Sequence, residues 1–569
     1  MTAAIEFKLL APNNKAATVL GSFSKWEEIP LAKDERGYFR TQIRLKDGIY
    51  QYKFRVQSQS PCLEPDEWVE VNDPYATEID STTGTSTIRI ESGERIIDTY
   101  VWKHDDTELP QNQELVIYEL HVADFCGADG SDSSSKFQQV IAKLDYLGDL
   151  GINAIELMPV NEYPGDYSWG YKVRDFFAVE SSYGTTADLK QLVDECHGRG
   201  IRVIMDGIYN HCNEECPLLL IDRNYWYYRD KHYPEDPANY WGPEFNYENF
   251  DAKLGIRPAW QFIGDVVNFW ILEYHIDGIR YDAVRQLDNR DFLHWITAEA
   301  KKTAGDKPFY NIAEHIPELP ELVAADGPMD GCWRESFRIF ALENLAGNSF
   351  DIAKLKQVLD ARQQGYQNTT NVINYLASHD RNHLLCESSF QNLDPEAAFK
   401  RAKLAAVVLV TAVGIPMLWM GEEFGQSTRQ TPNQPNNLQW SLLDNQQNRD
   451  LWEYYKDLIR LRKNFPALHT ENIEFFHENP EAKVLAYYRW SDEGTRVLVV
   501  VNFSDTYLSG YSIPNFPSSG SWHEWMYNKI VEVGEKDFKF DVPEWSAQVF
   551  LGDEDNYVSR QMISKVVQD

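Results

Sequence analysis

The chain has 569 residues, a formal net charge of -34, 43% hydrophobic residues and 25% charged residues. This composition is typical of a globular protein, and the length suggests about three domains of roughly 100–200 residues each. The strong negative charge argues against nucleic acid or an anionic lipid surface as a partner.

Neither a secretory signal nor a membrane span is expected. The N-terminal sequence MTAAIEFKLL has no basic segment followed by a long apolar run. A stretch of about 20 apolar residues, which a membrane-spanning helix needs, does not occur. The seven cysteines are an odd number and suggest no disulfide framework, which suits a reducing compartment. We therefore expect a cytoplasmic protein; its oligomeric state stays open.

Residues 1–95 contain short β-rich runs separated by Gly and Asp turns. The runs are TVLGSF, YFRTQIRL and YQYKFRV. Such alternation of short strands and turns predicts an N-terminal β-sandwich domain.

Residues 96–465 show a different pattern, in which apolar runs alternate with helical stretches. Seven runs are candidate strands: 116–120, 152–158, 201–206, 277–282, 309–313, 374–378 and 416–420. Repeated strand–helix units predict an α/β fold with a parallel sheet, and their number favours a (β/α)8 TIM barrel whose missing strand lies near residues 331–335. A doubly wound sheet would usually carry a glycine-rich phosphate loop after its first strand, and HVADFCGADGSDSSS is no such loop.

Two further segments complete the predicted organisation. Residues 212–255 form an unusually long, aromatic-rich excursion that we place over the C-terminal face of the barrel. Residues 466–569 return to strand patterns such as RVLVVVNFS, which predict a C-terminal all-β sandwich domain.

Acidic and basic side chains follow several of the predicted strands. Arg280 and Asp282 are two residues apart and therefore lie on the same side of their strand, Glu314 follows the next strand, and Asp380 follows a later one. Because strand ends of a barrel converge on one cleft, we expect these groups to meet. A single carboxylate there is usually a structural ion pair, but three together are less easily explained in that way.

This set of groups has the chemistry that glycosidic bond cleavage needs. One carboxylate attacks the anomeric carbon while a second carboxyl protonates the departing oxygen. A third carboxylate can stabilise the positively charged transition state. Arg280 would keep the nucleophile ionised and oriented.

The strand-end sequences DGIYNH, GIRYDAV, IAEH and ASHD resemble, in this order, the catalytic blocks of the α-amylase family, glycoside hydrolase family 13. GINAIELMPV and GIPMLWMGEEFG match as well, and residues 1–95 resemble a family 48 carbohydrate-binding module through GSFSKW, GIYQYKF and NDPYA. The overall layout is similar to that of glycogen branching enzymes, maltooligosyltrehalose trehalohydrolases and intracellular amylases.

The resemblance implies a role for each matching residue. Asp282 is expected to be the nucleophile, Glu314 the acid–base and Asp380 the transition-state stabiliser. Tyr171 is expected to stack under the glucose that is cleaved. The remaining substrate-binding residues implied in this way are Trp169, Asp206, His211, Arg280 and His379.

Several departures from the family pattern leave the specificity open. Ala283, Val284 and Arg285 replace the Lys-His of secreted α-amylases, so we expect no cofactor and doubt a structural calcium, although Asn210 matches one ligand position. His315 replaces the second Glu of branching enzymes, and residues 381–383, Arg-Asn-His, replace their Glu-Val-Val. Trehalohydrolases differ at both places too.

We therefore expect a retaining enzyme that hydrolyses α-1,4 links in glycogen, starch or maltooligosaccharides. A branching transferase that forms α-1,6 links and a maltooligosyltrehalose trehalohydrolase remain alternatives, because water and a sugar hydroxyl can attack the same covalent intermediate. A binding protein without activity would be expected to lack one of the three carboxyl groups, and all three are present. The expected partner is an α-glucan or maltooligosaccharide.

Overall fold

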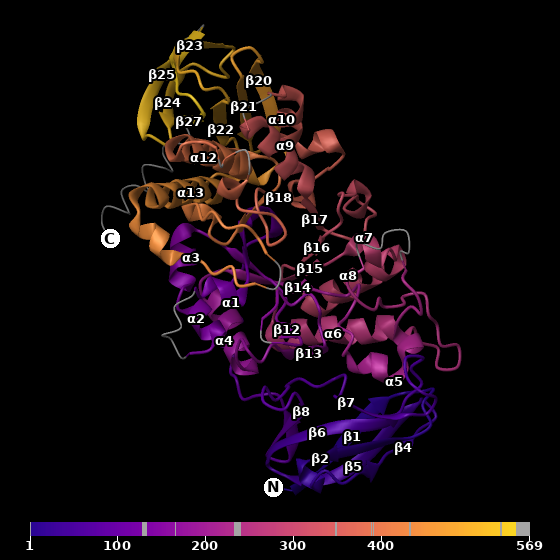
Figure 1. Cartoon of the computed structure of the whole chain (residues 1–569). Coiled ribbons are helices and arrows are strands. Elements are labelled where there is room, and N and C mark those ends of the chain that lie inside the picture. The colour runs from indigo at the N-terminus through magenta and orange to yellow at the C-terminus, as the bar shows by residue number, and fades with distance from the viewer. Residues whose placement is uncertain are drawn as a thin grey trace.

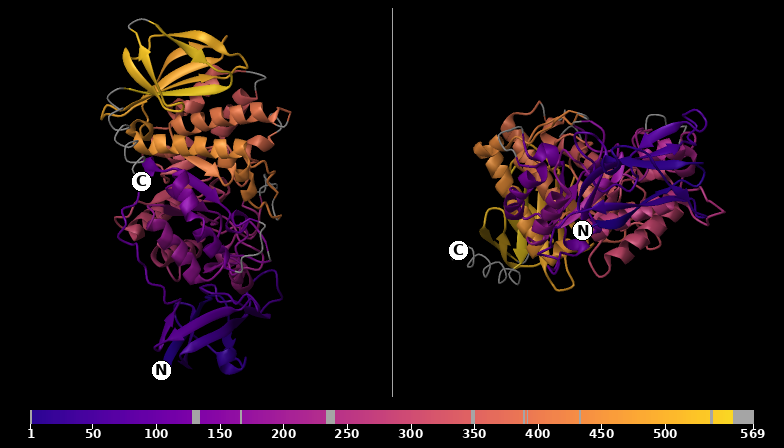
Figure 2. Two further views of the ribbon diagram at one scale, coloured as in Figure 1. Left: turned by 90° about the vertical axis from the view of Figure 1, so that its left-hand side faces the viewer. Right: turned by 90° about the horizontal axis from the view of Figure 1, so that it is seen from below.

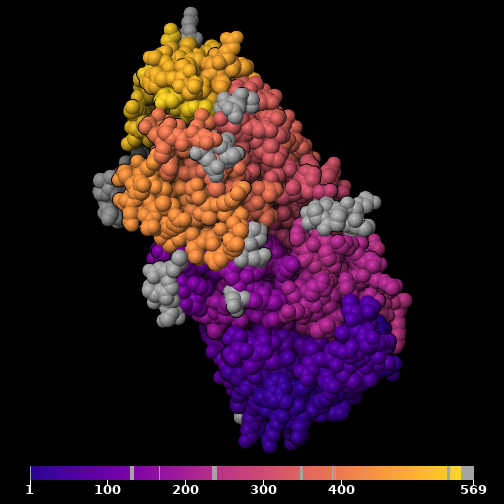
Figure 3. Space-filling view, viewed as in Figure 1, coloured from indigo at the N-terminus to yellow at the C-terminus, as the bar shows by residue number. Residues whose placement is uncertain are grey.

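The computed structural model of the chain describes residues 2–552 apart from 128–133, 166, 233–239, 347–349, 388–389, 391, 432–433 and 535–536. Three parts follow one another along the long axis of the molecule (Figure 1 and Figure 2): an N-terminal β domain, a central barrel and a C-terminal β domain. The space-filling view shows the same succession on the surface (Figure 3).

The N-terminal domain consists of two antiparallel sheets packed face to face. Alternate residues of β1 point inward, among them Ile5 and Phe7, and Tyr52 and Phe54 do so from β6. Phe7 and Tyr52 meet edge to face with ring centroids 5.2 Å apart. One sheet contains β1 (Thr2–Leu10), β5 (Tyr38–Lys46) and β4 (Ala32–Lys33); the other contains β3 (Ile29–Pro30), β2 (Ala17–Gly21), β6 (Gly48–Gln57), β7 (Trp68–Val71), β8 (Ser86–Glu91) and β9 (Glu94–Ile96).

The central part is a closed barrel of eight parallel strands, which confirms the predicted fold class. The missing strand is β17, at the predicted position, whereas residues 376–378 of one predicted run lie beyond the end of β18. In order around the barrel the strands are β10 (Ile117–Leu120), β11 (Ala154–Leu157), β14 (Arg202–Gly207), β15 (Gly278–Tyr281), β16 (Tyr310–Ala313), β17 (Gly331–Arg334), β18 (Val372–Tyr375) and β19 (Ile415–Trp419).

Helices connect these strands on the outside of the barrel. The Thr185 side chain caps α4 by accepting a hydrogen bond from the backbone N–H of Asp188, and the Asp188 side chain accepts one from the backbone N–H of Thr185. The helix ends just before Gly198. The helices described are α1 (Val122–Phe125), α2 (Lys136–Ile141), α3 (Leu144–Leu150), α4 (Thr186–His197), α5 (Pro217–Trp226), α6 (Pro258–Tyr274), α7 (Val284–Leu287), α8 (Arg290–Ala304), α9 (Glu335–Leu345), α10 (Ile352–Leu359), α12 (Pro395–Thr411) and α13 (Gln446–Asn464). None of the described helices is both long and apolar enough to cross a membrane.

The inward side chains of the strands change from apolar to charged along the barrel axis. Ile117, Ala154 and Ile204 belong to an apolar cluster inside the barrel. Two residues further along the same strands stand Glu119, Glu156 and Asp206, which therefore point inward as well. The strand register places Glu119 beside Glu156, and Asp206 beside Arg280. A charged layer thus covers the apolar core at the C-terminal end of the barrel.

The excursion after β14 is attached to the barrel through its backbone. His211, beyond the end of β14, forms a bridge with Glu244, and Tyr227 and Phe245 form a second bridge within the excursion itself. A short hairpin of β12 (Asn161–Glu162) and β13 (Asp175–Val179) follows β11. Residues 233–239, within the predicted excursion, lie outside the described residues.

The C-terminal β domain packs against the side of the barrel that is covered by α12 and α13 (Figure 1). Its core contains Val484, Leu498 and Phe550. One sheet has the order β20 (Ile473–Asn479), β21 (Val484–Trp490), β22 (Arg496–Asn502), β27 (Ser546–Gly552), β24 (Gly520–Glu524) and β25 (Lys529–Val533); a second pairs β23 (Leu508–Pro514) with β26 (Asp537–Val542).

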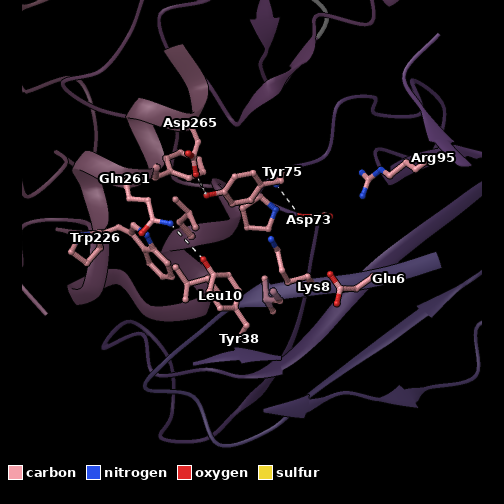
Figure 4. Close-up of a pocket in the computed structure, with 15 residues that line it drawn as sticks. Glu6, Lys8, Leu10, Tyr38, Asp73, Tyr75, Arg95, Trp226, Gln261 and Asp265 are labelled. Atoms are coloured by element: carbon pink, nitrogen blue, oxygen red, sulfur yellow. Dashed lines mark hydrogen bonds between the residues drawn. The ribbon is translucent and has the colours of Figure 1, made fainter. Parts of the chain in front are cut away.

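A cavity of about 400 Å³ lies between the N-terminal β domain and α5 and α6 of the barrel (Figure 4). The Tyr75 hydroxyl, just after β7, donates a hydrogen bond of 2.9 Å to Asp265 of α6 across this interface. Gln261 of α6 lies 3.5 Å from the Tyr38 hydroxyl of β5. The residues predicted to form the functional site do not line this cavity.

Candidate active site

A single buried guanidinium group organises the charged layer at the C-terminal end of the barrel. Arg280 is fully buried, and its Nη1 donates to both oxygens of Asp206, at 2.6 and 2.8 Å, and to Asp282 at 3.0 Å. Its Nη2 lies 3.2 Å from Glu314 Oε2. Three carboxyl groups from three consecutive strands of the barrel therefore converge on one cation. This arrangement follows from the alternation of β15, which points both Arg280 and Asp282 inward.

Glu314 is held in place by backbone as well as by Arg280. Its Oε2 accepts a hydrogen bond of 2.8 Å from the N–H of Ala283, the residue after Asp282. The Val284 N–H donates to the Glu314 carbonyl at 2.9 Å. The ends of β15 and β16 thus fix Asp282 and Glu314 next to each other.

Tyr171 and His379 form a stacked pair beside Asp206. The Tyr171 hydroxyl donates to Asp206 at 2.5 Å, and its ring lies 4.8 Å from the His379 ring at an interplanar angle of 22°. His379 Nδ1 is 2.5 Å from Glu119 Oε1, and its backbone N–H donates to the other oxygen of Glu119 at 3.2 Å. Glu119 at the end of β10 therefore orients a histidine that lies beyond the end of β18.

Asp380 is more open to solvent than the other two predicted catalytic carboxyl groups. Its side chain is 42% exposed, whereas those of Asp282 and Glu314 are 11% and 14% exposed. Asp380 Oδ1 lies 3.5 Å from His379 Nε2. Trp169 packs edge to face against His379, with ring centroids 5.6 Å apart.

His211 joins the site through backbone rather than through the carboxyl groups. Its Nε2 lies 2.8 Å from the Tyr171 carbonyl oxygen, which must accept, so Nε2 carries the proton. Its Nδ1 is 3.3 Å from the side-chain amide nitrogen of Asn210, which donates. Burial lowers the pKa of His211 to about 4, so the ring is neutral at pH 7. Both ring nitrogens are therefore engaged by protein groups, and no free donor remains for a ligand.

The surroundings of Asp282 and His379 shift the pKa values of both groups. Burial raises the pKa of Asp282 well above its usual value, Glu314 adds to this rise, and Arg280 opposes it. Burial lowers the pKa of His379, but the carboxylates of Asp380 and Glu119 outweigh burial and raise it to about 9. The site therefore contains a cationic histidine at neutral pH, and Arg280 is the group that favours the ionised form of Asp282 against burial and Glu314.

Two residues that the sequence reasoning missed belong to this site. Glu119 fixes His379, and the ring of Trp333 from β17 lies 4.4 Å from the Arg280 guanidinium carbon. A glutamate inside an apolar strand run is unusual, and this signal could have indicated Glu119. Trp333 gave no such signal, because tryptophan is largely buried in most proteins whatever its role.

The described part of the chain contains no group of three or more His, Cys, Asp or Glu side chains arranged to hold a metal ion. Asn210, which matches one calcium-ligand position of the family, uses its side-chain amide toward His211, and its carbonyl accepts from the Phe245 N–H at 3.0 Å.

The central part of the chain is a (β/α)8 barrel whose carboxyl groups converge at the C-terminal end of the strands. Enzymes with this fold carry their active site at that end. Comparison with known families identifies the catalytic domain. Residues 121–330 match the α-amylase catalytic domain, residues 476–553 its C-terminal all-β domain, and residues 6–74 the glycogen recognition site of AMP-activated protein kinase. The barrel therefore carries an α-amylase catalytic domain, and the chain is similar to α-glucan-active enzymes that contain this domain.

Similar proteins of known activity differ in what they do. A malto-oligosyltrehalose trehalohydrolase of Saccharolobus solfataricus is 26% identical over 562 residues, which cover 86% of this chain and 91% of that protein. A 1,4-alpha-glucan branching enzyme of Nitrosomonas eutropha is 27% identical over 572 residues, covering 91% and 74%. Pullulanase type I from Bacillus subtilis, solved with maltose, shares the fold with a TM-score of 0.80 at 21% identity, covering 96% of this chain and 85% of that one.

Proposed function

We propose that this chain is a retaining hydrolase of α-1,4-glucosidic bonds in glycogen, starch or maltooligosaccharides. The observation that carries the proposal is the Arg280 guanidinium, which contacts Asp282 at 3.0 Å and Glu314 at 3.2 Å and so fixes two carboxyl groups side by side. A close pair of carboxyl groups is the arrangement of retaining glycosidases, in which one of them is the nucleophile.

In the first step Asp282 attacks the anomeric carbon and forms a glycosyl ester, while the bond from that carbon to the departing oxygen breaks. Glu314 gives its proton to that oxygen. Glu314 Oε2 accepts from Ala283 N–H and contacts Arg280, so Oε1 is the oxygen that would carry the proton. The ion pair with Arg280 favours the ionised Asp282 that the attack requires.

In the second step a water molecule attacks the same carbon. Glu314 takes the proton of this water, the ester bond breaks and Asp282 leaves as a carboxylate, so the product keeps the α configuration. Asp380, which is exposed to the cleft, would stabilise the positive charge that develops on the sugar in both steps. The cationic His379 beside it would donate to a sugar hydroxyl.

A branching transferase is the second candidate, and the similarity to 1,4-alpha-glucan branching enzymes supports it. In that reaction a glucan hydroxyl replaces water in the second step. Two residues favour hydrolysis: His315, which holds the Pro317 carbonyl at 2.7 Å, and Arg381, which pairs with Glu335 at 2.8 Å. Both stand where branching enzymes usually have acidic residues.

We further propose a cytoplasmic location, supported by the odd number of cysteines, and activity without a metal cofactor.

The proposal is tested by incubating the protein with maltoheptaose and with amylose. Hydrolysis produces new reducing ends from both, and the first products have the α configuration. Branching instead changes the iodine colour of amylose without a matching rise in reducing ends. A complete lack of change in both assays would refute both candidates.

The assigned nucleophile is tested by Asp282→Asn, which is expected to lower kcat by about 10⁴-fold or more, because no ester can form. The matched control is Asp326→Asn, an exposed aspartate outside the site, which is expected to keep full activity. An Asp282→Asn variant with wild-type kcat would refute the assignment.

A further inference from the structure

Trp241 is exposed beside the candidate active site. Of the tryptophans in the described chain it and Trp26 are the most exposed, at 38% and 42%. Trp26 belongs to the N-terminal domain, whereas Trp241 lies in the excursion after β14 with its ring 5.8 Å from that of His211. Among the described residues no group accepts a hydrogen bond from the Trp241 indole N–H, and His211 is the only ring that packs against it.

The backbone around Trp241 is held tightly against the end of β14. The Cys212 N–H donates to the Pro243 carbonyl at 3.1 Å, and the Phe245 N–H donates to the Asn210 carbonyl at 3.0 Å. A Cβ atom at Gly242 would lie 2.2 Å from the Cys212 carbonyl oxygen, so only glycine permits this approach. Trp241 is therefore placed by a fixed segment of chain, although its side chain is exposed.

His211 provides a rigid support for the indole. Both of its ring nitrogens are engaged, by the Tyr171 carbonyl and by the Asn210 amide, and the ring is neutral. Because Tyr171 also bonds Asp206, the support is connected to the carboxyl groups of the site. An exposed indole that is fixed in this way loses little conformational entropy on binding a ligand.

We propose that Trp241 is the platform of a glucose-binding subsite at the rim of the cleft, against which one glucose unit of an α-glucan chain stacks. The flat apolar face of a pyranose matches an indole face, and the indole N–H can donate to a hydroxyl group. A single exposed ring at the site mouth suits one sugar unit rather than a protein partner, which would need a larger apolar patch. The inference rests on the proposed α-glucan substrate and adds the residue that binds the chain beyond the point of cleavage.

The test measures maltoheptaose binding by calorimetry in the inactive Asp282→Asn background. Adding Trp241→Ala is expected to weaken binding about tenfold, and Trp241→Phe is expected to remain within about threefold of the parent because a flat ring is retained. The matched control is Phe250→Ala, which removes another exposed aromatic ring of the same excursion and is expected to leave the affinity unchanged.

Steady-state kinetics in the otherwise wild-type chain separate a subsite from a structural role. Trp241→Ala is expected to raise KM for maltoheptaose about tenfold while kcat changes less than threefold and Tm is unchanged. Unchanged binding and KM in Trp241→Ala would overturn the inference, and so would equal losses of kcat and Tm, which would indicate a structural role. If the wild-type chain neither binds maltoheptaose nor acts on it, the proposed function fails and the subsite falls with it; a loss confined to Trp241→Ala tests the subsite alone.

Discussion

At the scale of single residues, Glu119 controls the charge of His379. It accepts from both the Nδ1 and the backbone N–H of that histidine, and with Asp380 it raises the pKa of His379 to about 9. We predict that Glu119→Gln lowers kcat about ten- to a hundredfold, because one charge-assisted hydrogen bond contributes about 1.5–3 kcal/mol. The measurement is steady-state hydrolysis of maltoheptaose, with Glu64→Gln, an exposed glutamate, as the control.

The pH dependence distinguishes this role from simple loss of packing. A histidine whose folded pKa lies above the usual 6.5 contributes stability that is fully present below that value and is lost as pH rises through about 9. An activity that needs the cationic ring falls over the same range. Glu119→Gln should move this alkaline limit to lower pH. An unchanged alkaline limit in the variant would show that Glu119 does not set the charge of His379.

At the scale of elements, the register of β10 and β11 places two inward glutamates side by side. Glu156 is 1% exposed, and neither of its carboxylate oxygens has a hydrogen-bond partner within the described residues. Burial and the neighbouring Glu119 raise the pKa of Glu156 well above its usual value, and Arg280 only partly opposes them. The buried, unpartnered carboxyl group of Glu156 therefore lowers the stability of the fold.

We predict that Glu156→Met raises the free energy of unfolding by about 1–4 kcal/mol at neutral pH, as replacing buried polar groups by apolar ones of similar volume often does. Because the folded pKa of Glu156 lies above its unfolded value, the cost grows as pH rises above about 4.5. Urea midpoints at pH 5 and pH 8 measure this, with exposed Glu481→Met as the control. A gain that is larger at pH 5 than at pH 8 would contradict the prediction.

The strand pattern was sufficient to predict which elements carry the site. Asp206, Arg280 and Asp282 lie on or directly after predicted strands, so their convergence on one face of a barrel followed from alternation and from the closed sheet. The sequence could not show that His211 has both nitrogens engaged, since this depends on the Tyr171 carbonyl, 40 residues away. It could not reveal Glu119 either, because the partner of Glu119 is 260 residues later in the chain.

At the scale of the whole molecule, changes in composition along the chain predicted the succession of β domain, barrel and β domain. The way in which these parts attach was not predictable, because their contacts join residues far apart in sequence. Tyr75 and Asp265 are separated by 190 positions, and no local pattern marks either of them. Both residues line the cavity between the N-terminal domain and the barrel, and a hydrogen bond joins them there (Figure 4).

We predict that Tyr75→Phe loosens the N-terminal domain from the barrel. The substitution keeps the ring that stacks on Phe177 at 4.7 Å, but it removes the hydroxyl that donates to Asp265, a carboxyl whose pKa burial already raises. Leaving such a group without its partner costs about 1–3 kcal/mol. The expected results are a lower Tm and faster proteolysis within residues 97–111, which contain no helix or strand. Tyr527→Phe, at an exposed tyrosine, is expected to change neither. Because the active site lies at the C-terminal end of the barrel strands, kcat is expected to stay unchanged in Tyr75→Phe. Equal proteolysis rates in Tyr75→Phe and Tyr527→Phe would show that this hydrogen bond does not hold the domains together.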